Sequence, residues 1–257
     1  MNRPRGIDRR RLLGRAAGGI STLLLSGCNK LSHSAWFTSM LESAETVNRH
    51  VQAAITPRET RAREYTDEDL SPHFRSNGTH DPADAGYQAL ARNGFADWRL
   101  ELGGLVDRPA HLSLAELRAM PAITQITRHD CVEGWSCIGK WTGVPLGAVL
   151  APLGVQRGAR YVMFFCYDRV EGALERYYES IDLAEAQHPQ TMLAYAMNDR
   201  TLPIPYGAPL RLRLGRQLGY KMAKYLRRIE LVESFSRIEG GHGGFYEDNG
   251  YEWYAGI

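Results

Sequence analysis

The segment TRHDCVEGWSCIGKWTGVPL, residues 127–146, contains two of the chain's four cysteines, together with Glu133 and two tryptophans. A cysteine can act as a nucleophile, a metal ligand or a disulfide partner, and the thiolate is its reactive form. The spacing between Cys131 and Cys137 is C-x5-C, which is unusual for zinc ligands, and the chain contains no CxxC motif. A bridge between Cys131 and Cys137 is an alternative. The role of each cysteine depends first on the compartment, because disulfides persist in oxidising compartments and are rare in reducing ones.

Residues 1–28 indicate an exported protein. Paired arginines in DRRRLLG (8–14) precede a modest apolar stretch at 16–25, a pattern that resembles a twin-arginine signal. LLSGC (24–28) resembles a lipobox, in which Cys28 is lipidated. A simple membrane anchor is the alternative, although the apolar stretch is short for a span. We expect the twin-arginine export machinery as a partner and a periplasmic location, with a lipid anchor if Cys28 is acylated.

Lipidation of Cys28 would leave three cysteines, namely Cys131, Cys137 and Cys166. An odd number cannot form a complete disulfide framework. We therefore expect one of the three to be kept as a thiolate for another purpose.

The charge of the chain gives no reason to expect a nucleic acid partner. Its formal net charge is +2, but residues 1–27 contribute a net +5, so the remainder is near −3. An apolar content of 44% in 257 residues is sufficient for a sizeable core.

The pattern of apolar and polar residues divides the chain after residue 28 into three parts. Residues 29–70 form a helical and charged spacer, in which apolar residues recur at steps of three and four until Pro57. This helix could lie on a membrane or a partner, or pack on its own domain. Residues 71–235 contain many short strands and few helices, which predicts a strand-rich, mixed α+β single domain. Residues 236–257 are rich in glycine and aromatic residues and are expected to pack on that domain.

Four ordered motifs resemble the molybdopterin-binding domain of the sulfite oxidase family. They are NGFADWRLELGGLVDRP (93–109), CVEGWS (131–136), KWTGVPL (140–146) and YGAPLRLRLGRQLGYKMAKYLRRIEL (206–231). The similarity is greater to the exported bacterial branch that includes the periplasmic methionine sulfoxide reductase catalytic subunit. It spans about residues 70–235, and it implies the fold of that family, an oxidoreductase, and one molybdenum per chain bound as Mo-molybdopterin.

In that family the cysteine of the C-V-E-x-W-S motif is the protein ligand of molybdenum. The resemblance therefore implies that Cys131 is the metal ligand and the catalytic residue, and that Cys137 is an additional cysteine. It also implies that the K-M-A-K loop (221–224) holds the pterin and its phosphate. A soft thiolate suits a high-valent metal already held by two dithiolene sulfurs, and a thiol bound to a cation is deprotonated. The cofactor carries the two-electron chemistry, so any general acid or base is secondary.

A basic run offers a place for the phosphate of the pterin. Between residues 200 and 229 there is no acid, and the basic residues are Arg200, Arg211, Arg213, Arg216, Lys221, Lys224, Arg227 and Arg228. Arg211 and Arg213 alternate with leucines, which predicts arginines on one strand face and leucines toward the core. Guanidinium groups bind phosphate through two parallel hydrogen bonds. A solvated basic face is the alternative, but the resemblance implies that the pterin and its phosphate are bound by Arg211, Met222, Ala223 and Lys224.

The resemblance adds two cofactor-binding positions at which this chain departs from the related reductases. Tyr206 stands where they have an asparagine, and it can still donate a hydrogen bond. Cys166 stands where they have a threonine, about thirty-five residues after the ligand cysteine. Because counting across loops is uncertain by a residue or two, Tyr167 or Asp168 is an alternative to Cys166.

Asn77, in FRSNG (74–78), matches an asparagine that binds the cofactor in the family. His80 lies close to it in sequence and is a further candidate for cofactor binding. For His80, as for His129, a structural role is the alternative.

The residues after Cys131 bear on the reaction. Sulfite-oxidising members follow their cysteine with A-G-N-R, whose arginine helps to form an anion pocket, whereas this chain has V-E-G-W. An acid and a bulky aromatic residue disfavour a small dianion, because like charges repel in a pocket of low dielectric. We expect oxygen-atom transfer that reduces a small or protein-bound S- or N-oxide, such as methionine sulfoxide, with electrons from a membrane cytochrome b-type haem subunit. A sulfite dehydrogenase-like oxidation and a lipoprotein binding module without turnover are the alternatives.

Overall fold

The computed structural model describes residues 60–170 and 172–257, together with scattered positions between Ser34 and Val51. The predicted signal, including Cys28, lies outside the described residues. Contacts divide the chain into two units, residues 1–57 and residues 58–257. In the described part of the chain, no helix has the length and apolar character that crossing a membrane requires.

The first unit is described only at isolated helical positions. Four large apolar side chains at these positions are exposed: Trp36, Met40, Val47 and Val51. They are spaced by four and seven residues, which places them near one face of a helix.

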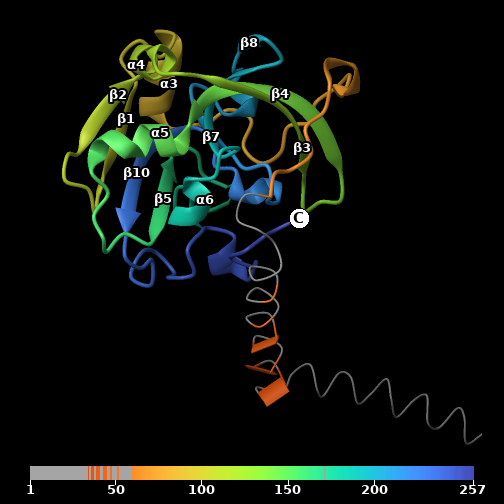
Figure 1. Ribbon diagram of the computed structural model, residues 1–257, viewed down its shortest axis with the longest axis vertical. Coiled ribbons are helices and arrows are strands. Elements are labelled where there is room, and N and C mark those ends of the chain that lie inside the picture. The colour runs from red at the N-terminus through yellow and green to blue at the C-terminus, as the bar shows by residue number, and fades with distance from the viewer. Residues whose placement is uncertain are drawn as a thin grey trace, which may run out of the picture. The chain divides into compact units, whose positions relative to one another are not determined.

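The second unit contains two β-sheets (Figure 1). The first sheet has five strands in the spatial order β2 (Ala110–Ser113), β1 (Arg99–Gly104), β10 (Leu226–Val232), β5 (Tyr161–Cys166) and β6 (Tyr178–Asp182). Its pairs are antiparallel except for β1 and β10, which run parallel with Leu102 opposite Ile229.

The second sheet is antiparallel and holds the cysteine segment. Its strands are β3 (Ile123–Asp130), β4 (Ser136–Pro145), β7 (Met192–Met197) and β8 (Arg200–Thr201), and β9 (Arg211–Arg213) also pairs with β7. The long hairpin of β3 and β4 places Cys131 in the connection between its two strands.

Short helices connect the strands. The α-helices of this unit are α3 (Ala85–Arg92), α4 (Leu114–Ala119), α5 (Leu146–Leu150) and α6 (Leu183–Ala186), and the 3-10 turns are η1 (Asp67–Asp69), η2 (Ala151–Leu153), η3 (Ile204–Tyr206), η4 (Gly219–Lys221) and η5 (Glu247–Asn249). Side-chain caps begin α3, α4 and α6. At α4 the Ser113 side chain accepts a hydrogen bond from the Glu116 amide, and the Glu116 carboxylate accepts one from the Ser113 amide.

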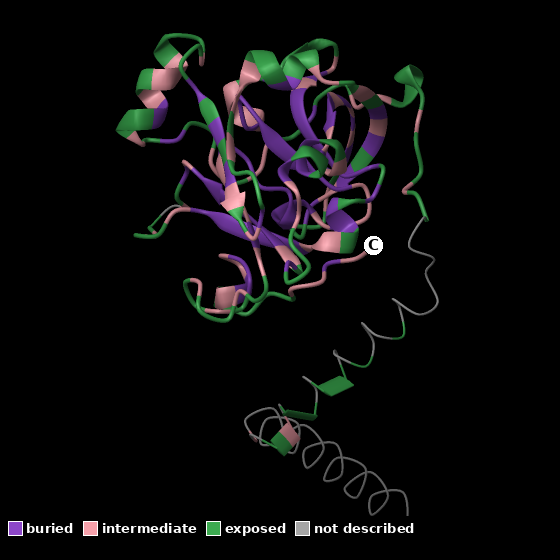
Figure 2. Ribbon diagram, turned by 60° about the vertical axis from the view of Figure 1, so that its left-hand side comes forward, coloured by how far each residue is buried: buried purple, intermediate pink, exposed green. Residues whose placement is uncertain are grey.

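The main core lies between the two sheets. Buried side chains from β1, β5 and β10, such as Leu102, Phe164 and Ile229, contact buried side chains from β4 and β7, such as Val144 and Leu193. Figure 2 shows these strands as the buried interior of the unit, with the exposed residues on helices and loops. Two packed sheets with few, short helices form a strand-rich α+β domain, so the predicted fold class is confirmed.

The last residues of the chain contact β6 of the first sheet and the segment just before η4. The Phe245 amide donates to the Tyr178 carbonyl at 3.0 Å, and the Leu218 amide donates to the Ala255 carbonyl at 2.9 Å. The indole of Trp253 donates to the Ser180 hydroxyl at 2.8 Å. These contacts position residues 245–255 next to β6 and η4.

Candidate functional site

Cys131 begins the loop that joins β3 to β4. Its amide donates to the Trp135 carbonyl at 2.9 Å, and its carbonyl accepts from the Gly134 amide at 3.0 Å. Gly134 has φ of +85°, a conformation that favours glycine. The loop is therefore held by its own backbone, and it keeps the Cys131 side chain 93% buried, with 7% exposed. Burial raises the pKa of the Cys131 thiol, in the absence of a metal.

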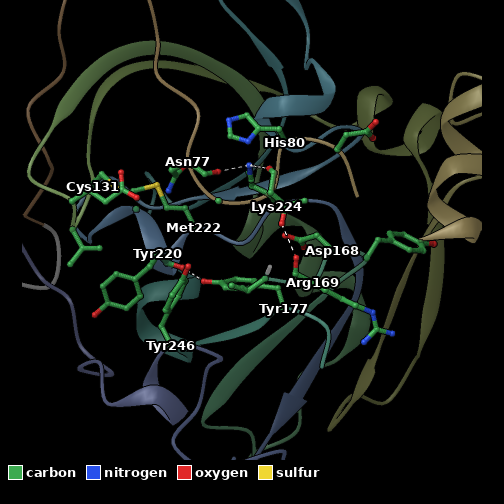
Figure 3. Close-up of a pocket in the computed structure, with 18 of the residues that line it drawn as sticks. Asn77, His80, Cys131, Asp168, Arg169, Tyr177, Tyr220, Met222, Lys224 and Tyr246 are labelled. Carbon is green, nitrogen blue, oxygen red and sulfur yellow. Dashed lines mark hydrogen bonds between the residues drawn. The ribbon is translucent and has the colours of Figure 1, made fainter. Parts of the chain in front are cut away.

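Cys131 borders a cavity of about 700 Å³ (Figure 3). The lining comes from segments that are far apart in sequence: residues 77–84, 131–133, 167–170, 219–224 and 246–251, together with Tyr177. In Figure 3, Asn77, His80 and Lys224 lie along one side and Tyr177 and Tyr246 along the other, with Cys131 toward one end and Arg169 toward the opposite end. A cavity of this size can enclose a drug-sized ligand or an organic cofactor.

Lys224 fixes one wall of the cavity. Its ammonium donates to the carbonyls of Asn77 at 2.7 Å, Thr79 at 2.5 Å and Pro205 at 3.0 Å. The Tyr225 hydroxyl donates to the same Thr79 carbonyl at 2.7 Å. Burial, aided by the nearby charge of Arg211, lowers the pKa of Lys224 to about 7. Lys224 thus ties the loop at residues 77–79 to the wall.

Two buried polar atoms beside the cavity have no partner among the described residues. One is Oδ1 of Asp168, a side chain that lines the cavity and whose pKa burial raises to about 6. The other is Nε2 of His129, whose Nδ1 accepts a hydrogen bond from Arg213 at 2.9 Å. Arginine has no acceptor, so the proton of the neutral His129 ring is on Nε2. Burial and the neighbouring arginines lower the pKa of His129, which keeps it neutral.

Gly219 separates His129 from the cavity. A Cβ atom at this position would lie 2.5 Å from His129 Nε2. Only glycine therefore lets the η4 turn approach the ring this closely. Of the two unpartnered groups, only Asp168 lines the cavity, where its Oδ1 is a buried acceptor. Such an atom normally has a partner in folded proteins, so it is consistent with a polar ligand.

The structure brings five of the predicted site residues to the cavity: Asn77, His80, Cys131, Met222 and Lys224. The remaining four do not line it: Cys166, Tyr206, Arg211 and Ala223. The two alternatives to Cys166, namely Tyr167 and Asp168, are both part of the lining.

Cys166 and Tyr206 are occupied elsewhere. Cys166 is fully buried in the core between the sheets, and burial raises its pKa well above the usual value. The Tyr206 hydroxyl donates to the Phe74 carbonyl at 2.7 Å. Neither side chain reaches the cavity, because their positions on β5 and η3 direct both toward other parts of the protein.

Both arginines of β9 are buried behind the cavity wall. Arg211 donates to the carbonyls of Tyr206 at 3.0 Å and Met222 at 3.3 Å, and its guanidinium lies 5.0 Å from the ring centre of Trp141. Arg213 lies 4.4 Å from the same ring. The predicted alternation with leucines places the arginines on one face, but this face is covered too, with side-chain exposure of 2% and 1%. They support the residues of the wall rather than line it.

The described cysteines are free thiols, which speaks against the bridge between Cys131 and Cys137 as an alternative. Cys137 lies on β4 and is packed with Phe74 and Trp141. Its sulfur accepts a hydrogen bond from the Arg75 amide at 3.4 Å. Cys131 is thus the one cysteine of the described residues that lines the cavity.

Sequence reasoning missed Arg169 and the tyrosines of the opposite wall. Tyr177 and Tyr220 line the cavity, and Tyr246 and Tyr251 join them from the C-terminal segment. The ring centres of Tyr246 and Tyr251 are 5.0 Å apart, and those of Tyr220 and Tyr251 are 5.3 Å apart. The clustering of aromatic residues at the end of the sequence was the one available signal.

Comparisons with known proteins identify the family of the chain. Residues 88–237 match the family model described as "oxidoreductase molybdopterin binding domain". The chain is 37% identical over 239 residues to the "Putative protein-methionine-sulfoxide reductase subunit YedZ1" of Azospira oryzae, covering 93% of this chain and 83% of that protein. It is 37% identical over 148 residues to the protein-methionine-sulfoxide reductase catalytic subunit MsrP of Xanthomonas axonopodis pv. citri, covering 54% and 46%.

The chain therefore spans about half the length of the second relative. Among solved structures, the sulfane dehydrogenase SoxCD from Paracoccus pantotrophus is similar with a TM-score of 0.49 and 22% identity, over 54% of this chain and 39% of that chain.

Proposed function

The chain belongs to the family of oxidoreductase molybdopterin-binding domains, and on this premise we propose that it reduces S- or N-oxides, such as methionine sulfoxide, at a molybdenum ion bound by Cys131. The observation that carries the proposal is the position of Cys131: its thiol lies at one end of a cavity of about 700 Å³ that motifs from the whole domain enclose. The relatives' names supply the substrate class.

The residues of the cavity fit a molybdopterin. A thiol is the soft ligand that a molybdenum–dithiolene centre takes from the protein. The Asp168 Oδ1, which has no hydrogen-bond partner among the described residues, can accept a hydrogen bond from an N–H group of a pterin ring. The cationic groups of Lys224 and Arg169 favour the phosphate. When bound, the molybdenum supplies two-electron oxygen-atom transfer.

The chain's own residues then have distinct tasks. Cys131 would ligate the metal, and the backbone hydrogen bonds within its loop hold the backbone that carries its sulfur. Lys224 holds Asn77 and Thr79 in place through their carbonyls, so that this loop presents a fixed surface to the cofactor. Arg211 and Arg213 act one layer behind, and the roles of Arg211, Tyr206, Ala223 and Cys166 at the cofactor stay predictions.

The surroundings of Cys131 favour an uncharged oxide over sulfite. Glu133 is exposed in the same loop and its carboxylate accepts a hydrogen bond from the Trp135 indole at 2.8 Å. A dianionic substrate would be repelled by this carboxylate, whereas a sulfoxide is neutral. Reduction takes up two electrons and two protons and releases a sulfide and water. The electrons come from a partner, which we propose to be a membrane cytochrome b-type subunit, in keeping with the relative that is named as a subunit.

The test starts with protein purified from a host that makes the molybdenum cofactor. We expect about one molybdenum per chain, reduction of methionine sulfoxide with an artificial electron donor, and little reduction of ferricyanide by sulfite. Cys131→Ser should lose the activity by about 1,000-fold or more, because the metal loses its protein ligand. Cys137→Ser is the matched control. Molybdenum-free, inactive protein, or loss of activity in the Cys137 variant alone, would contradict the assignment.

We also propose that the protein works in the periplasm after twin-arginine export. The support is the sequence pattern at residues 8–28. Replacement of Arg9, Arg10 and Arg11 by lysine should retain the protein in the cytoplasm, as measured by fractionation. Mass spectrometry of the exported form would show whether Cys28 carries a lipid.

A further inference from the structure

Tyr177, Tyr220, Tyr246 and Tyr251 form one wall of the cavity, called the tyrosine wall. The match to the family model ends at residue 237, so Tyr246 and Tyr251 lie in the C-terminal segment beyond it, residues 238–257. Tyr246 packs against Tyr177, Tyr220 and Tyr251, with ring centres 5.9, 6.1 and 5.0 Å apart. The C-terminal segment thus completes a site whose remainder belongs to the family domain.

Buried ion pairs hold this segment in place. The Lys221 ammonium pairs with Glu179 at 2.5 Å and also with Glu247, and all three side chains are at most 1% exposed. The amide of Phe245 donates to the Tyr178 carbonyl at 3.0 Å. Glu247 follows Tyr246 directly, so the ion pairs fix the backbone that carries the Tyr246 ring.

The Tyr246 hydroxyl is a free donor on the cysteine side of the cavity. Among the described residues it has no hydrogen-bond partner, whereas the hydroxyls of Tyr177 and Tyr220 donate to the carbonyls of Tyr220 and Glu252. Burial raises the pKa of Tyr246. In Figure 3, Tyr246 lies toward the same end of the cavity as Cys131.

Two large apolar side chains in the lining of the cavity are exposed, Val132 and Tyr251, and together they are called the apolar rim. Exposed apolar side chains at a cavity offer contact area to another molecule.

We propose that the C-terminal segment forms the substrate subsite, in which the Tyr246 hydroxyl donates a hydrogen bond to the oxygen of an uncharged organic oxide, while Tyr251 and Val132 contact its organic group. The inference rests on the proposed function and specifies its substrate class. A phenol donates well to a polar S–O or N–O oxygen. The apolar rim and Glu133 favour a neutral substrate with an organic substituent over an oxyanion.

The experiment compares two ligands that differ only in the oxygens on sulfur. Methyl phenyl sulfone carries these oxygens but is not the oxide that the enzyme reduces. Methyl phenyl sulfide has none. Their dissociation constants are measured by calorimetry on the molybdenum-loaded protein. Tyr246→Phe removes only the hydroxyl and should weaken sulfone binding about 3–10-fold, the worth of one hydrogen bond. Sulfide binding should be unchanged.

Tyr251→Ala should weaken the binding of both ligands, because it removes apolar contact area. Tyr254→Phe is the matched control, since Tyr254 lies in the same segment and is not part of the lining. Equal sulfone binding by wild type and Tyr246→Phe, or equal weakening of sulfone and sulfide binding, overturns the inference. Failure of the wild-type protein to hold molybdenum and reduce a sulfoxide would instead overturn the proposed function.

Discussion

Lys221 and Lys224 lie three residues apart in one buried segment, and they have opposite surroundings. Lys221 is paired with two carboxylates, Glu179 and Glu247, away from the cavity. Lys224 lines the cavity and donates only to backbone carbonyls, with Asp168 as the nearby acid. A lysine whose charge is balanced by paired carboxylates holds segments of the chain together. A lysine without paired carboxylates keeps its positive charge available for a ligand.

The lack of a paired carboxylate affects the pKa of Lys224. Burial lowers this pKa to about 7, so near neutral pH the charge of Lys224 depends on what occupies the cavity. An anionic phosphate would stabilise the charged form. The same basic run therefore contains a structural lysine and a ligand-facing one, and sequence alone does not distinguish them.

The largest effect on stability should come from Lys221→Met. The variant leaves Glu179 and Glu247 buried without a cation, and it should lower the free energy of unfolding by about 3–5 kcal/mol. Denaturant unfolding measures this loss. Lys140→Met is the control, because Lys140 also pairs with two carboxylates, Asp67 and Asp199, but at the surface. Equal losses in the two variants would contradict the structural role of Lys221.

Lys224→Met should act on the cofactor instead. Removal of the ammonium frees three partly buried carbonyls and takes away a cation from the cavity, so retention of molybdenum after gel filtration should fall about tenfold or more. Metal and phosphate analysis of the eluted protein measures it. Arg200→Met, an exposed member of the same basic run, should retain the cofactor. A fully loaded Lys224→Met protein would show that the charge is not used.

Asp168→Asn should change how stability depends on pH. Burial raises the pKa of Asp168 from its usual value of 3.8 to about 6, so between these values the folded protein holds a proton that the unfolded chain has released. The stability contribution is present below about pH 4 and is lost as pH rises through 6, at up to about 1.4 kcal/mol per pH unit. Unfolding curves at pH 4, 5, 6 and 7, at matched molybdenum content, should show this slope in wild type and a smaller slope in the variant.

Cys137→Ser should have the smallest effect. The Cys137 sulfur lies outside the cavity and makes only long contacts, to the Arg75 amide at 3.4 Å and the His73 carbonyl at 3.8 Å. Activity should change by less than about threefold, because a hydroxyl can replace both contacts. Steady-state rates at matched molybdenum content provide the measurement, and a loss comparable with that of Cys131→Ser would reverse the assignment of the two cysteines.

Much of the fold could be predicted, because strand patterns and ordered motifs are local features of the sequence. The same holds for Asn77, Met222 and Lys224, which stand in or near those motifs and line the cavity. Arg211 shows the limit. Alternation tells which side chains share a strand face, but not that Trp141 and η3 cover the second face as well.

The tyrosine wall depends on contacts that no local pattern encodes. Tyr246 reaches the cavity because Glu247 pairs with Lys221, a partner 26 residues earlier, and because Phe245 is bonded to β6. Aromatic composition predicted that residues 236–257 pack on the domain, but it did not indicate which of their side chains would line the cavity. Long-range pairing of this kind has to be seen in three dimensions.

The span of the cavity lining has a consequence for biogenesis. Its earliest residue is Asn77 and its latest is Tyr251, so the walls cannot meet while the later part of the chain is still in the ribosomal tunnel. The cavity is therefore complete only after residue 251 has left the tunnel.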